Sequence, residues 1–258
     1  DTTPESGPPK SGQYLYAITT LVEDHAYEVT GVDGSAVHSV SNGHVAAVVS
    51  DCARQKLRPE RAHLAAHKEV LSRLMLESTV LPMAFGIIAD DGKAVRRLLT
   101  LNQKEFLEQL ERVAGKVEIG LRVNWDVPNI FEYFIDIHPE LRAARDRLLG
   151  NQRQPRQEDK LELGQLFDHI LNEDREAHSE KLEEALGPCC AEIKRSPPRN
   201  VNEVANLKCL VARDGQKRLE EAVFQAARQF DNNYAFDLNG PWAPHNFVEM
   251  DLKLNGLK

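Results

Sequence analysis

The chain has 258 residues, of which 41% are hydrophobic and 28% are charged, so it is long enough to bury a core without disulfides or metals. Its net charge of −8 disfavours binding to nucleic acid or to an anionic membrane, because basic surfaces recognise both. No segment approaches the roughly 20 consecutive apolar residues that span a membrane. The length predicts one large domain or two of ordinary size.

The four cysteines are spaced as packing thiols rather than as a metal or redox motif. Cys52, Cys189, Cys190 and Cys209 include no C-x-x-C pair, so we expect reduced thiols in a cytosolic protein. Residues 1–12 are rich in Pro, Gly, Ser and Thr and lack the apolar core of a secretory signal. We expect them to form a disordered tail.

The first half of the chain alternates β-like runs with two helical patterns. The expected strands are 14–20, 36–40, 45–50, 79–86 and 117–125, and the expected helices open at Pro59 and at Asp90 or Asp91. Asn42-Gly43 between two strands is a strong hairpin signal. The second helix is expected to run unbroken to Gly115. This order predicts an α+β domain with a ferredoxin-like arrangement at residues 13–125.

The second half predicts a helical connection and then a second α+β domain that begins with a helix. Residues 126–157 carry a helical pattern at 131–149, broken near Pro139, and a polar linker. The domain at 158–258 is expected to contain a long helix at 158–186, strands at 190–194 and 207–213, a helix capped by Asp214, and strands at 234–239 and 247–252.

Two proline-containing segments stand out from this pattern. In residues 79–86, Pro82 interrupts an apolar strand, and a proline cannot donate a hydrogen bond to a neighbouring strand, so this strand must lie at a sheet edge or carry a bulge. In residues 238–248, Pro241 and Pro244 restrict the backbone on both sides of Trp242. Trp242 is either a plug of the core or a preorganised contact residue, and the pattern favours neither.

The sequence carries only weak signals of a catalytic or metal site. His63 and His67 lie four residues apart on one helix, but Leu64 stands where a zincin would need Glu, and no third ligand is indicated. We therefore expect His67 to be structural. Cys52 lacks an identifiable base. No G-x-S-x-G, Walker or G-x-G-x-x-G pattern occurs in the sequence. We expect no catalytic, cofactor or metal site.

Six separated segments, taken together and in order, resemble one known family, the gas vesicle protein F/L family (GvpF/GvpL). They are residues 14–18, 46–50, 67–71, 79–86, 117–123 and the Gly240-Pro241-Trp242 segment with Pro244, Phe247 and Val248. The resemblance covers nearly all of the chain after residue 12. Ala84 and Ala243-Pro244-His245 depart from the family pattern. The lack of a long charged extension favours an F-type member.

The resemblance implies an accessory or minor structural protein of gas vesicle formation, without enzymatic activity, located at the gas vesicle within the cytoplasm. Its implied partners are the hydrophobic shell protein and other accessory proteins. The candidate partner-binding residues are Pro82, Phe85, Trp242 and Phe247. The alternative is a cytosolic small-molecule-binding sensor or enzyme on a ferredoxin-like fold, which a buried polar pocket with a perturbed His67 or His169 would favour.

Overall fold

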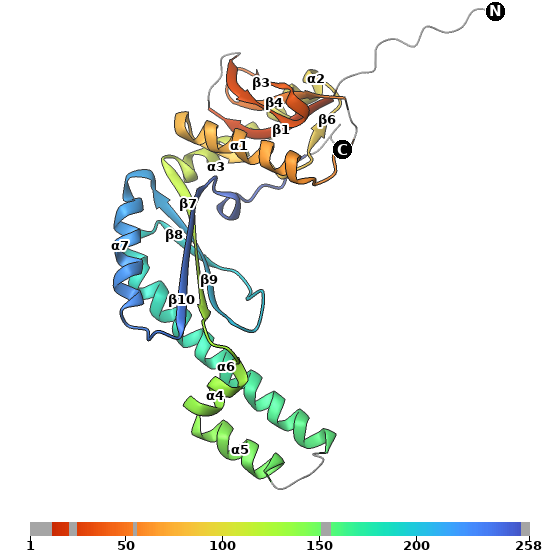
Figure 1. Cartoon of the computed structure of the whole chain (residues 1–258). Coiled ribbons are helices and arrows are strands. Elements are labelled where there is room, and N and C mark those ends of the chain that lie inside the picture. The colour runs from red at the N-terminus through yellow and green to blue at the C-terminus, as the bar shows by residue number, and fades with distance from the viewer. Residues whose placement is uncertain (1–11, 21–24, 54–55, 151–155, 254–258) are drawn as a thin grey trace, which may run out of the picture. The chain divides into compact units, whose positions relative to one another are not determined.

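The computed structural model describes residues 12–20, 25–53, 56–150 and 156–253, and the chain divides into two compact units (Figure 1). The first unit is Asp1–Glu118 with Pro241–Lys258, and the second is Ile119–Gly240. The predicted boundaries at 125 and 158 do not coincide with these units, because the end of the chain joins the first unit. Of the predicted tail at 1–12, all but Gly12 lies outside the described residues.

The first unit is built on a sheet with the strand order β2-β3-β4-β1-β5, in which β6 also pairs with β1. Its elements are β1 (Gly12–Thr19), β2 (Ala26–Thr30), η1 (Val32–Gly34), β3 (Ala36–Ser41), β4 (Ala46–Cys52), α1 (Arg61–Glu77), β5 (Val80–Pro82), β6 (Ile88–Ala89), α2 (Gly92–Leu101), α3 (Gln103–Val113) and η4 (His245–Phe247). Helix α1 packs against β1, β2 and β5 (Figure 1). The prediction of an α+β protein is confirmed.

The ferredoxin-like arrangement is not confirmed. Four strands precede α1, where one strand is expected in that arrangement, and the strand expected to complete the sheet, β7 (Lys116–Trp125), belongs to the other sheet. Strand β2 did not figure in the predicted order. It is short, and Tyr27 is its single buried residue, so it carries a weak apolar signal.

The predicted hairpin lies between β3 and β4, which pair antiparallel from Val37↔Ser50 to Ser41↔Ala46. The side chain of Asn42 accepts hydrogen bonds from the backbone amides of His44 and Val45, at 3.0 Å each. Gly43 has a φ of +90°, a conformation that glycine adopts without steric cost. The Asn-Gly pair therefore forms the turn that the sequence indicates.

The strand that contains Pro82 lies at the end of the sheet, as predicted. Pro82 stands opposite Ala17 of β1, and β5 has only one neighbour in the strand order. The next residue, Met83, donates from its backbone amide to the carbonyl of Tyr16 at 2.9 Å. A proline is tolerated here because its missing donor faces no further strand.

The single helix predicted from Asp91 to Gly115 is divided in two, a correction to the sequence interpretation. Asn102 ends α2 and precedes α3 with a φ of −116° and a ψ of 15°, and its buried amide donates to the Leu98 carbonyl at 2.9 Å. Asp91 caps α2, since its side chain accepts from the Ala94 amide at 2.8 Å. Gly115 ends the helical region at a φ of +66°, as expected.

The second unit is built on a four-stranded sheet with the order β10-β7-β9-β8. Its elements are α4 (Ile130–Ile137), α5 (Pro139–Leu149), α6 (Gln157–Leu186), η2 (Gly187–Cys189), β8 (Glu192–Arg195), β9 (Glu203–Ala212), η3 (Arg213–Gly215), α7 (Gln216–Ala227) and β10 (Tyr234–Trp242), the last two residues of which belong to the first unit. The helix break at Pro139 and the long helix α6 match the predictions. Helix α6 packs on β9 and also on α4 and α5 (Figure 1). Asp214 lies in η3, and Gly215 rather than Asp214 precedes α7.

The strand predicted at 247–252 does not form, although the segment is held along α3. The amide of Asn246 bonds to Glu118, and the amides of Glu249, Asp251 and Lys253 bond to the side chains of Gln109, Glu105 and Asn102. Alternate backbone amides thus find side-chain acceptors on a helix, spaced three and four residues apart, instead of a neighbouring strand. Apolar and polar residues do alternate in this segment, but its backbone amides bond to side chains rather than to a neighbouring strand.

Candidate functional site

A cluster of aromatic rings in the first unit surrounds His67 of α1. The ring of Tyr16 stacks on His67 at 5.6 Å between centroids, and Tyr14 and Phe85 meet it edge-on at 5.7 and 5.8 Å. Tyr14 and Tyr16 come from β1, the strand that pairs with β5. The residues of the motifs at 14–18, 67–71 and 79–86 are therefore neighbours in space.

The hydrogen bonds of His67 define its protonation. The Tyr14 hydroxyl accepts from the Gly86 amide at 3.3 Å, so its own proton is free to be donated to Nδ1 of His67 at 2.8 Å. The ring also makes a hydrogen bond to the backbone of Met83, which by itself would raise its pKa. Burial, and secondarily the nearby His245, lowers the pKa of His67 to about 4, so the ring is neutral at neutral pH.

His67 thus helps to hold the backbone that follows β5. Its partner in the predicted i, i+4 pair, His63, contacts the Arg58 carbonyl and Asp33 at 3.0 Å each. Among the described residues, no group of three or more His, Cys, Asp or Glu side chains could hold a metal ion. Both imidazoles are therefore occupied by structural hydrogen bonds.

Of the four candidate partner-binding residues, two are accessible. Pro82 is buried in β5, and Phe247 is completely buried, with 0% of its surface exposed. Phe85 and Trp242 are both half-buried and reach the surface. Of the four residues, Phe85 and Trp242 are thus accessible from outside this unit, whereas Pro82 is part of a paired strand and Phe247 is part of the core.

Two consecutive residues of α1 connect these accessible rings. His67 contacts Phe85, and the ammonium group of Lys68 lies 3.8 Å from the centroid of the Trp242 ring. This cation–π contact holds Trp242 against the helix while it leaves part of the ring in solvent. We call Phe85, Lys68 and Trp242 the aromatic surface. It brings together two segments that are far apart in the sequence.

The segment after Trp242 is anchored by a buried carboxylate that sequence reasoning missed. Glu118 is only 4% exposed, and it accepts from the backbone and side-chain amides of Asn246 at 2.9 and 2.6 Å. A glutamate inside the otherwise apolar first half of β7 was a signal that a buried donor had to exist. The pair fixes where Trp242 and Phe247 can lie.

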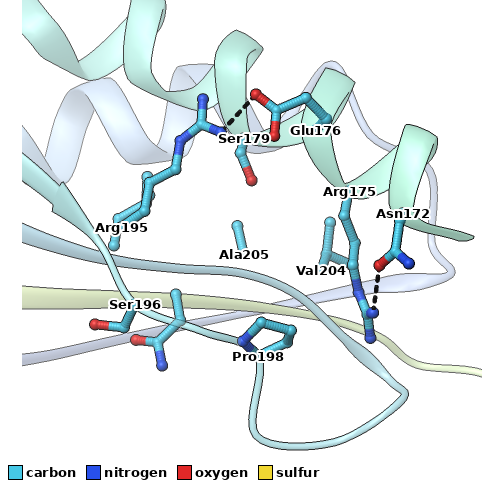
Figure 2. A pocket seen from close by; sticks show the side chains of 11 residues that line it. Asn172, Arg175, Glu176, Ser179, Arg195, Ser196, Pro198, Val204 and Ala205 are labelled. Carbon is cyan, nitrogen blue, oxygen red and sulfur yellow. Dashed lines mark hydrogen bonds and ion pairs between the residues drawn. The ribbon is translucent and has the colours of Figure 1, made fainter.

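The second unit has a separate hollow of about 250 Å³ between α6 and strands β8 and β9 (Figure 2). Its two arginines are already engaged by the protein. Arg195 bonds to Glu183 and to Glu176, and Arg175 donates to Asn172 and to the carbonyls of residues 200, 201 and 203. Because these guanidinium donors face internal acceptors, the hollow offers little free charge to a ligand.

The positions of His67 and His169 do not support the alternative of a small-molecule-binding sensor or enzyme. His67 is enclosed by aromatic rings and does not line the hollow between α6, β8 and β9. His169 is an exposed residue of α6, with 68% of its side chain accessible, and it pairs with Glu173 at 3.3 Å. Neither residue lies in a buried polar pocket.

Fold and site together define a two-unit α+β protein whose histidines, buried carboxylate and prolines position its own backbone. The chain belongs to the gas vesicle synthesis protein GvpL/GvpF family, whose model matches residues 12–249. No helix in the described part of the chain is long and apolar enough to span a membrane. The family is one of gas vesicle proteins and not a known family of enzymes.

Relatives of both types match almost end to end. Gas vesicle protein F of Streptomyces sp. (strain CB03234) is 30% identical over 92% of this chain and 99% of that protein. Gas vesicle protein L1 of Halobacterium salinarum is 26% identical over 92% of this chain and 90% of that protein. The crystal structure of GvpF from Anabaena sp. PCC7120 superimposes with a TM-score of 0.81 at 24% identity, over 93% of this chain and 99% of that one. That structure shows that the fold is shared.

Proposed function

We propose that this chain is an accessory protein of gas vesicle formation that binds the hydrophobic shell protein during assembly and contacts other accessory proteins. The family match over residues 12–249 is the observation that carries this proposal. The proposed role is non-catalytic, and the proposed location is the gas vesicle within the cytoplasm.

The physical reason for such a protein lies in the shell subunit. A subunit that is hydrophobic on one face aggregates before assembly unless a partner covers that face. A partner suited to this task presents apolar groups that are accessible but held in place, so that little conformational entropy is lost on binding. A surface made of flexible aliphatic side chains would meet this need less well.

The aromatic surface has these properties. Phe85 lies in the turn whose Gly86 amide donates to the Tyr14 hydroxyl, and Trp242 is held from one side by Lys68. Pro241 and Pro244 restrict the backbone beside Trp242, which lowers the entropic cost of presenting its ring. Tryptophan is enriched among the residues that dominate binding energy at protein interfaces. We therefore assign shell-protein binding to this surface.

The test is co-purification of the tagged chain with co-expressed shell protein. Trp242→Ala is expected to weaken binding by about 2 kcal/mol or more, roughly thirtyfold, while the melting temperature changes little. Phe224→Ala is a matched control, because Phe224 is an aromatic residue of α7 in the second unit and is 65% exposed. The control should bind as the unaltered chain does.

Two results would count against this assignment. If Trp242→Ala lowers stability by roughly 3–5 kcal/mol without weakening binding in the folded fraction, Trp242 is a plug of the core. If the variant is unchanged in both measurements, the segment has neither role. Lys68→Ala provides a second variant. It removes the cation–π contact with Trp242 but no apolar core contact, so its folding is not in question.

A further inference from the structure

The outer strands of the two sheets differ in how they are protected against pairing with another chain. β5 has three residues, all buried, and includes Pro82. β2 has five residues and an irregular register between Tyr27 and Thr30. β8 has four residues, three of them charged. Short length, proline, irregular register and charge are the usual protections of a sheet edge.

The outer strand β10 is less well protected, because its one proline, Pro241, lies near its end and leaves residues 234–240 without such a residue. It has nine residues, none of which is buried, and Leu238 is 36% exposed. Asp237 is its single charged residue, and it pairs with Arg122 of β7 at 3.2 Å. A long, nearly neutral edge strand is a template for an additional strand. We consider its residues 234–240, which lie in the second unit.

The register with β7 shows which amides of β10 face outward. The Asp126 amide donates to the Asn233 carbonyl at 2.6 Å, Arg122 pairs with Asp237, and Gly120 lies against Asn239. These three pairs belong to one antiparallel register. In such a ladder, the backbone groups of alternate residues point toward the partner strand and away from it. The amides and carbonyls of Tyr234, Phe236 and Leu238 therefore point away from β7, whereas Gly240, at a φ of +126°, departs from regular strand geometry.

We propose that β10 pairs with β10 of a second copy of this chain, antiparallel and centred on Leu238, so that the two sheets join into one. Centring on Leu238 places Phe236 opposite Gly240 of the second copy and Leu238 opposite itself. An aromatic ring opposite a glycine is a favourable cross-strand pair, because it covers the exposed glycine backbone.

Side chains on the other face of the strand are also compatible with a second copy. In this register Asp237 stands opposite Asn239 of the other chain, an acceptor opposite an amide, and no like charges face each other across the pair. Asp237 is already compensated by Arg122 within its own chain. The net charge of −8 on each chain opposes association at long range, so the dimer should be favoured by added salt.

The oligomeric state of the purified chain tests the pairing, and the result is independent of shell-protein binding. Sedimentation over increasing protein concentration should show a monomer that becomes a dimer. Leu238→Lys places two ammonium groups at the centre of the pair and should abolish the dimer. Leu161→Lys is the matched control, because Leu161 is 60% exposed on α6, and it should dimerise as the unaltered chain does.

Amide exchange of the same samples tests the geometry. Exchange at Phe236 and Leu238 should slow at least tenfold from low to high concentration, whereas the amides of Asp237 and Asn239 should stay protected throughout. A chain that remains monomeric, or a dimer that persists in Leu238→Lys, would overturn the proposal. Protection of these amides only after addition of the shell protein would show that the edge accepts another protein instead of a second copy.

Discussion

Replacement of His67 by leucine gives a quantitative test of the site. At neutral pH the variant loses the acceptor of the Tyr14 hydroxyl and the hydrogen bond to the backbone of Met83, both in a buried setting. Leaving a buried polar group without its partner costs about 1–3 kcal/mol, so the two losses should lower the free energy of unfolding by roughly 2–6 kcal/mol. Metal content should be unchanged, because His67 is not a ligand.

The loss of stability caused by His67→Leu should become smaller as the pH falls. The pKa of His67 is lowered from 6.5 to about 4 in the folded chain, so the unfolded chain binds a proton first as the pH falls. The stability that depends on the neutral ring is complete above pH 6.5 and is lost as the pH falls toward 4. The difference in the free energy of unfolding between the unaltered chain and His67→Leu should therefore narrow by about 2–3 kcal/mol from near pH 7 to near pH 4.5.

Urea unfolding of the unaltered chain and of His67→Leu at both pH values measures this difference, and carboxylates that titrate in the same range largely cancel. His44→Leu is the control, since the exposed His44 lies in the β3–β4 turn and its replacement should change stability by no more than about 0.5 kcal/mol. A His67→Leu penalty that stays constant or grows on acidification would refute the assignment of a neutral, hydrogen-bonded imidazole.

Three further predictions concern the segments that position the aromatic surface. Glu118→Gln leaves one acceptor for the two donors of Asn246 and should lower stability by about 1–3 kcal/mol, visible as a reduced melting temperature; an unchanged melt would show that the pair is dispensable. Gly86→Ala, at a φ of +92°, should cost about 1 kcal/mol or more in urea unfolding, and a stabilised variant would contradict the backbone assigned there. Hydrogen exchange should be faster at residues 83–86 than at residues 45–49 of the central hairpin, and equal protection would be inconsistent with the position of β5 at the sheet edge.

Local features of the fold were predictable where one residue type determines the backbone. Asn42-Gly43 forms its hairpin, Pro139 begins α5, and Pro82 lies in an edge strand, each for a steric or hydrogen-bonding reason that the sequence carries. The break at Asn102 was not predicted, because asparagine is only mildly unfavourable inside a helix and the apolar stripe continues across it.

Long-range partners could not be predicted. The register that places β7 in the second sheet depends on strands that are distant in the sequence, and apolar alternation does not specify which sheet a strand joins. The segment after Trp242 alternates like a strand but bonds to side chains of α3. At the candidate site, the sequence singled out Trp242 and Phe85, whereas the contact of Lys68 with Trp242 and the burial of Phe247 required coordinates.

The most direct test of the central claim is flotation of a strain from which this gene, and any second F/L-type gene, has been deleted. The account predicts that the deletion strain forms no normal gas vesicles and sinks, that the unaltered gene restores buoyancy, and that Phe224→Ala restores it equally. Trp242→Ala, although folded, should restore it poorly. A deletion strain that floats with normal vesicles would contradict the proposed role in gas vesicle assembly.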